Sequence, residues 1–267
     1  MKRCFLQDKL NDLYEQYNRR KYVHPDPLEF LYNYKKIRDR EIVGLIASSL
    51  AYGRVAQILK SVSGVLKIMG NSPYDYLRRT PEKDIFTHFE AFVHRFARGC
   101  HLAALMIGMK HVIAGYGSIC KCFKIGFDSS DETIVPALTA FSKKIIEASD
   151  DCNPGHLIPC PDKGSACKRL NLYLRWMVRK DDVDPGGWNG ICPSKLIVPL
   201  DTHMFRVCGR LGLTSRKQAN LKAAIEITTG FKQWSLDDPV RYDFALTRFG
   251  IRDDLEGDNA LIKHLDI

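Results

Sequence analysis

Two side chains in the second half of the chain have types that could act together in nucleophilic chemistry. Lys168 offers an amine and Asp201 a carboxylate, and they are 33 residues apart in the sequence. An unprotonated amine is a nucleophile, and an ionised carboxylate stabilises positive charge, so one group must lose charge while the other keeps it. The fold would have to bring these two positions together.

Each of the two residues is expected at the beginning of a helix. Lys168 follows KGSAC in the first turn of a helix that we expect over residues 166–178, where the positive end of the helix dipole disfavours a charged amine. Asp201 precedes a segment whose apolar residues recur at three- and four-residue spacing, which predicts a second helix.

Both positions also have a purely structural interpretation. Asp201 could be an N-cap that accepts amide hydrogens of the first turn, which stabilises a helix by about 1 kcal/mol. Lys168 could be a solvated surface lysine beside Arg169. Local sequence alone favours these interpretations, so the rest of the chain has to decide between them.

The charge of the protein is concentrated around these two residues. The 267-residue chain carries a formal charge of +9. Residues 163–222 contain 12 Lys or Arg and 4 Asp, which gives this segment +8. Such a concentration of positive charge favours an anionic partner such as nucleic acid.

The pattern of apolar residues predicts an almost entirely helical protein. Helical spacing recurs over most of the chain, and no sustained two-residue alternation indicates a sheet. No continuous apolar run is long enough to span a bilayer and we find no signal peptide, so we expect a cytoplasmic protein that does not enter a membrane. The expected helices cover residues 2–22, 41–52, 55–70, 81–97, 101–114, 133–148 and 166–178, with another after Pro199.

The nine cysteines offer a different possible chemistry. Cys152, Cys160, Cys167 and Cys192 fall in one region with His156, but none has the two-residue gap of zinc fingers. We therefore expect thiols and no bound metal, although a metal-dependent enzyme stays open as an alternative.

The segment PLDTHMFRVCGRLGL at Pro199 is similar to the one that carries the catalytic aspartate in helix-hairpin-helix DNA glycosylases of the endonuclease III and 8-oxoguanine DNA glycosylase superfamily. KGSACKRLNLYLRW resembles the hairpin and helix that carry their lysine nucleophile, with Lys168 at the lysine position. Together with AYGR at Ala51, these segments most resemble an uncharacterised bacterial family near the glycosylases. The iron-sulfur cluster of endonuclease III has no counterpart, because Cys208 is the last cysteine.

The resemblance implies an all-α, two-lobed fold of the helix-hairpin-helix DNA glycosylase type with a cleft between the lobes. One lobe would comprise residues 1–40 with 195–267, and the other residues 41–194. Of the glycine-rich hairpin only Gly164 remains, followed by Ser165 and Ala166. The residues implied to contact nucleic acid are Gly164, Ser165, Arg169, Arg175, His203, Arg206, Arg210, Tyr52 and Arg54.

The activity that the resemblance implies is removal of a damaged base, with an oxidised purine as the first candidate and Lys168 and Asp201 as catalytic residues. It also implies cleavage of the backbone by AP lyase activity. The partner would be double-stranded DNA containing the damaged base, bound by a monomer without a cofactor. Trp188, Trp234 and Tyr52 could stack on a base, although a core position is expected for each, and Asp243 could orient the lysine. A non-catalytic nucleic-acid-binding protein on the same scaffold is the alternative.

Overall fold

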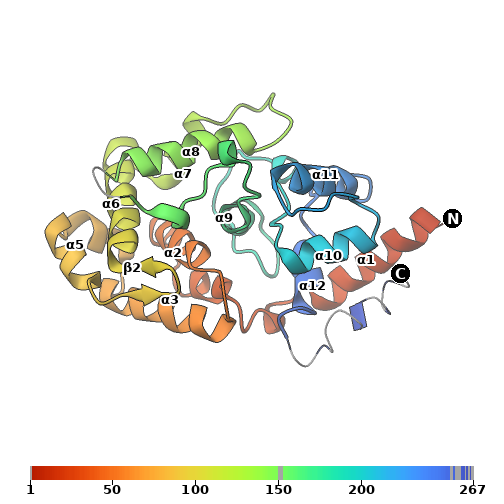
Figure 1. The fold of residues 1–267 in the computed structure, drawn as a ribbon, viewed down its shortest axis with the longest axis horizontal. Helices are drawn as coiled ribbons and strands as arrows, with labels where there is room; N and C mark the ends of the chain where they lie inside the picture. The colour runs from red at the N-terminus through yellow and green to blue at the C-terminus, as the bar shows by residue number, and fades with distance from the viewer. Residues whose placement is uncertain are drawn as a thin grey trace. The chain divides into compact units, whose positions relative to one another are not determined.

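A computed structural model describes residues 2–149 and 153–252, together with residues 255, 260, 261, 263 and 265. Most of these residues are helical, and among them the strands are limited to one short antiparallel hairpin. The predicted all-α character is therefore confirmed (Figure 1).

The chain divides into two compact units. Unit 1 combines Met1–Pro25 with Gly164–Ile267, and unit 2 is Asp26–Lys163. These limits differ from the boundaries expected at residues 40 and 194. The helix Pro27–Asn33 packs on the early core helix Ile37–Ser49, so residues 26–40 belong to unit 2. Arg175 forms an ion pair with Asp243, so residues 164–194 belong to unit 1. Each segment was expected in the other unit.

Unit 2 is built around one long apolar helix, α6 (Gly99–Tyr116; Figure 1). It packs against α4 (Pro73–Arg79), α5 (Glu82–Phe89), α7 (Ile119–Ile125) and α8 (Val135–Glu147). Its residues 102–109 are all buried, as expected for a helix that is apolar on every side. A Cβ at Gly108 would lie 2.5 Å from the carbonyl oxygen of Ile145, so this glycine allows the close approach of α8. The other helices are η2 (Pro27–Asn33), α2 (Ile37–Ser49), α3 (Val55–Met69), η3 (Gly155–Leu157) and η4 (Pro161–Lys163).

The helix expected over residues 81–97 is shorter than predicted. α5 ends at Phe89, and the strands β1 (Val93–His94) and β2 (Ala97–Arg98) follow. The side chain of His94 is buried and forms hydrogen bonds with Ser61 and with the backbone of Tyr52. These long-range contacts replace the helix, because tertiary interactions readily override weak local propensity.

Unit 1 contains the N-terminal helix and the helices of the basic segment. α1 (Lys2–Tyr17) packs against α12 (Asp243–Arg248), which also contacts α10 (Thr202–Arg210). Asn220 caps α11 (Leu221–Lys232) by accepting the amide hydrogen of Ala223. The remaining elements are η1 (Arg20–Tyr22), α9 (Lys168–Val178) and η5 (Pro193–Lys195).

No single helix in the described part of the chain has the length and apolar composition needed to cross a membrane. The consecutive pair α6 and α7 meets those criteria only jointly, and the two helices are bent by 74° at the break between them.

Candidate active site

The segment before Lys168 forms a tight turn that is fixed to the beginning of α11. The carbonyl oxygen of Gly164, whose φ is +75°, accepts the amide hydrogen of Leu221, and Ser165 pairs with Asn220. The Ser165 hydroxyl accepts the amide hydrogen of Cys167, whose own φ of +47° is in the left-handed region. α9 then begins at Lys168, so this lysine extends from a helix N-terminus.

The two carboxylate oxygens of Asp201 have different partners. Oδ1 accepts the amide hydrogen of Met204 at 2.8 Å, which makes Asp201 the N-cap of α10. Oδ2 lies 3.4 Å from Nζ of Lys168. The capping interpretation is therefore confirmed, and the structure also brings the two residues together as the functional interpretation requires.

The Lys168–Asp201 pair remains accessible from outside the protein. The side chains of Lys168 and Asp201 are 31% and 35% exposed. A substrate could thus reach both groups, whereas a fully buried pair could not react with one. The helix cap fixes the carboxylate, because rotation of Asp201 would break its hydrogen bond to Met204.

A second carboxyl group, Asp243, lies in the interior behind the Lys168–Asp201 pair. Asp243 is 2% exposed and accepts a hydrogen bond from Arg175. Burial raises the pKa of Asp243 despite the opposing effect of Arg175. Burial, together with the nearby carboxylates Asp243 and Asp201, also raises the pKa of the Cys208 thiol well above its ordinary value. This thiol is therefore neutral at physiological pH.

The structure corrects the expectation that Arg175 contacts nucleic acid. Arg175 is 2% exposed and forms ion pairs with Asp184 and Asp243, both of them also buried. At the C-cap of α9, four residues later, the buried Arg179 pairs with Asp184 and Asp238. A guanidinium without water must be paired, so Arg175 belongs to an internal network that joins α9 to α12.

Other expected nucleic-acid contacts in unit 1 differ in their accessibility. Arg206 and Arg210 are exposed on α10, and Arg169 is half-buried on α9. His203 is also half-buried: its Nε2 lies 3.3 Å from the carbonyl oxygen of Leu246, and its ring packs closely over Gly250. His203 therefore joins α10 to the end of α12, while Arg206 and Arg210 are exposed to solvent.

The two expected contacts in unit 2 lie just before α3. Arg54 is exposed, whereas Tyr52 is half-buried with its ring packed edge-on against His94 and His156. The Tyr52 hydroxyl donates to the carbonyl oxygen of His94 and lies 2.9 Å from Nε2 of His156. Tyr52 therefore supports the neighbouring loops.

The tryptophans and cysteines add no further group to the site. Trp188 and Trp234 are 2% and 8% exposed, in agreement with the core positions expected for them. Cys160 and Cys167 are buried thiols and Cys192 is an exposed one, whereas Cys152 lies outside the described residues. No group of three or more potential metal ligands occurs in the part of the chain that the structure describes.

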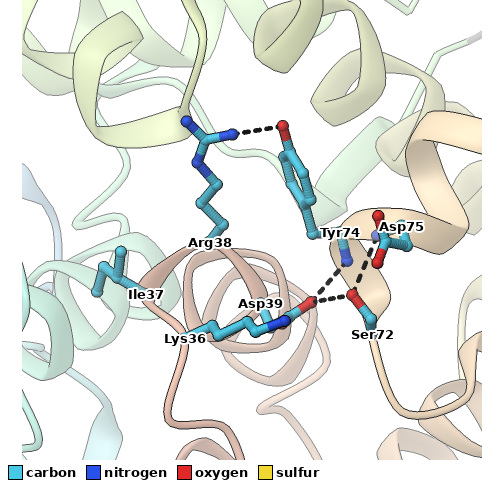
Figure 2. A pocket seen from close by; sticks show the side chains of 7 residues that line it. All are labelled: Lys36, Ile37, Arg38, Asp39, Ser72, Tyr74 and Asp75. Carbon is cyan, nitrogen blue, oxygen red and sulfur yellow. Dashed lines mark hydrogen bonds between the residues drawn. The ribbon is translucent and has the colours of Figure 1, made fainter.

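A separate pocket of about 440 Å³ lies in unit 2, where α2 and α4 begin (Figure 2). Asp39 accepts hydrogen bonds from the Ser72 hydroxyl and the Tyr74 amide, and Arg38 donates to the Tyr74 hydroxyl at 2.6 Å. These polar groups bind one another and join the two helices. None of the residues that line the pocket is among the expected site residues, and we assign it a structural role.

The internal network is the feature that the sequence interpretation missed, although a signal for it was present. Arg175 follows Lys168 by seven residues, which places both side chains on one face of α9. Because Lys168 faces α10, the same face directs Arg175 toward the interior. Helical periodicity could therefore have separated Arg175 from the arginines that contact solvent.

Comparison with known sequences identifies a family but no activity. A family model described as "Protein of unknown function (DUF2400)" matches residues 26–252. No curated protein and no solved structure matches the chain.

Proposed function

This chain belongs to the DUF2400 family, and we propose that it is a DNA glycosylase with AP lyase activity. The single observation that carries the proposal is the distance of 3.4 Å between Lys168 Nζ and Asp201 Oδ2. An accessible amine and an accessible carboxylate, supplied by the beginnings of two helices, are the two groups that such chemistry requires.

Asp201 would stabilise the charge that develops on the sugar. As the N-glycosidic bond breaks, its electron pair leaves with the base and positive charge grows at the anomeric carbon. A carboxylate already held in place by a hydrogen bond to Met204 interacts with that charge without having to reorganise.

Lys168 would act as the nucleophile. Its ammonium proton passes to the departing base, directly or through water, and the nitrogen lone pair forms a bond to the anomeric carbon. The C1′–O4′ bond of the sugar then breaks and the nitrogen passes a proton to O4′, which leaves a protonated Schiff base. A proton on C2′ passes to water, the C3′–O bond breaks, and the 3′ phosphate leaves, so that the backbone is cleaved.

The charge around the pair supports DNA as the substrate. Arg206 and Arg210 are exposed on the helix that Asp201 caps, and residues 163–222 carry +8. Lysine and arginine bind phosphates irrespective of base sequence, so they account for affinity for DNA but not for the choice of base. A flipped oxidised purine is the first substrate to test, because extrusion costs least where pairing is weakened.

Borohydride trapping tests the proposal directly. Reduction of a Schiff base fixes the protein covalently to a duplex that carries an abasic site or an oxidised purine. We expect an adduct with the wild type and none with Lys168→Ala. Lys163→Ala is the matched control, because Lys163 is an exposed lysine five residues earlier and should leave the adduct unchanged.

The same experiment distinguishes the non-catalytic alternative. The ion pair between Lys168 and Asp201 would also hold α9 against α10 in a protein that only binds nucleic acid. DNA binding by the wild type without an adduct on any of these duplexes would favour that alternative. An adduct that persists in Lys168→Ala would show that another residue is the nucleophile.

A further inference from the structure

The hairpin of unit 2 presents an aromatic side chain to solvent at its tip. β1 and β2 are joined by a two-residue turn formed by Arg95 and Phe96. Phe96 is 72% exposed, more than any other large hydrophobic residue in the part of the chain that the structure describes. A phenyl ring held away from the core at this point gains little from burial within the chain.

The turn is held in an unfavourable backbone conformation. Arg95 has a φ of +52°, a left-handed value that costs a residue with a side chain some free energy and persists only where neighbouring contacts impose it. Its side chain crosses Gly53 so closely that a Cβ there would lie 2.7 Å from Arg95 Cδ. The Arg95 guanidinium lies 5.5 Å from the centre of the Phe96 ring.

The base of the hairpin is fixed from inside. His94 is 1% exposed and forms hydrogen bonds with the Ser61 hydroxyl and the Tyr52 carbonyl oxygen. The ring of His156 lies edge-on to both Tyr52 and Phe96. The exposed tip is therefore carried on a rigid support, which reduces the entropy lost when it binds a partner.

The surroundings of the tip are basic. Segments 50–60 and 91–101, which meet at the contact between Tyr52 and His94, contain Arg54, Lys60, Arg95 and Arg98 and no acidic residue. An exposed aromatic ring within a group of cations is the combination by which proteins bind unpaired nucleic acid, with stacking on a base and neutralisation of phosphates.

We infer that the turn Arg95–Phe96 is a base-stacking contact for DNA, with the Phe96 ring placed against a nucleobase at an opened position of a duplex. The Arg95 guanidinium would neutralise a neighbouring phosphate, and Gly53 provides the room that the arginine needs. The inference rests on the proposed function for the identity of the partner, but it concerns a different unit from Lys168 and Asp201.

The test uses Lys168→Ala protein, so that binding is measured without reaction. The probe is a fluorescent duplex with one abasic-site analogue and 2-aminopurine opposite it. We expect Phe96→Ala to weaken binding about tenfold and to abolish the change in 2-aminopurine fluorescence, whereas Phe96→Trp restores both. Leu236→Ala, which removes another exposed apolar side chain, 69% exposed, is the control and should have no effect.

A second variant tests the arginine separately. Arg95→Gly keeps the left-handed backbone at no steric cost, so the hairpin should fold as before. Loss of one phosphate contact should reduce the slope of log affinity against log salt by about one. An unchanged slope would remove Arg95 from the contact surface.

The outcomes separate this inference from the proposed function. Equal binding and equal fluorescence change for Phe96→Ala and its parent would overturn the stacking contact even if the wild type forms a borohydride adduct. Loss of the fluorescence change in Phe96→Ala would support the contact even if no duplex is trapped. Failure of the parent to bind any DNA would overturn both.

Discussion

Both ends of α9 carry ion pairs between a basic residue and an aspartate, but one pair is accessible to water and the others are buried. At the beginning, Lys168 and Asp201 form an ion pair whose side chains are 31% and 35% exposed. At the other end, in the interior, Arg175 pairs with Asp184 and Asp243, and the C-cap residue Arg179 also pairs with Asp184. The comparison shows that a basic residue in this segment cannot be assigned a function from its charge, because accessibility distinguishes the two pairs.

The difference follows from the free energy of the ions. Burial of a charge costs several kcal/mol unless hydrogen bonds and an opposite charge compensate. Accordingly, Arg175 and Arg179 each have at least two carboxylate partners. Lys168 remains near water and needs less compensation. A half-exposed pair can separate when a substrate arrives, whereas the interior network cannot separate without unfolding.

The largest expected effect is on the interior network. Arg175→Ala would leave the Asp243 and Asp184 carboxylates buried without this partner, and we expect a loss of about 3–5 kcal/mol in the free energy of unfolding. Denaturant titration measures it. Arg210→Ala, on the exposed face of α10, should change the same quantity by less than about 0.5 kcal/mol. Similar losses for the two variants would remove the distinction between the interior and the surface arginines.

A smaller free-energy change, but a large change in rate, is expected at Asp201. Asp201→Asn keeps an oxygen that can cap α10 and removes the charge, so the fold should retain its stability. Single-turnover cleavage should fall about 10²–10³-fold, with DNA affinity nearly unchanged. Cleavage at the wild-type rate would leave Asp201 with its capping role alone.

The smallest effect concerns pH and Asp181. Burial would raise the pKa of Asp181, but Arg179 and the backbone amides of Val183 and Asp184 together lower it below its ordinary value of 3.8. The stabilisation is therefore complete above that value and is lost as the pH falls through the lower pKa of the folded protein. Asp181→Asn should cost about 1–2 kcal/mol near neutral pH, and the difference should shrink below pH 3.8. A difference that stays constant from neutral to acidic pH would contradict the ion pair of 2.7 Å between Arg179 and Asp181.

The sequence predicted most of the helices but not every element between them. Apolar periodicity located α2, α3, α6, α8, α9 and α10 within a few residues. It extended α5 into the hairpin, because His94 is held there by Ser61 and Tyr52, residues more than thirty positions away. Interactions of that kind leave no periodic signal in a single sequence.

The candidate site was also predictable only in part, because local motifs are visible in the sequence and long-range packing is not. Two short motifs indicated Lys168 and Asp201, and each motif is a local feature of a helix start. Helical periodicity could have identified the buried Arg175, but the exposure of Phe96 depends on which side of its element faces the core, which composition does not reveal. Residue types therefore indicated the chemistry, and periodicity and packing decided which residues could carry it out.

Peptide mapping of the reduced covalent adduct tests the central claim most directly. After borohydride reduction and digestion, mass spectrometry identifies the residue that carries the sugar. The account predicts the adduct on Lys168, the residue whose Nζ lies 3.4 Å from Asp201. An adduct on any other residue, or no adduct with a duplex that the protein binds, would contradict it.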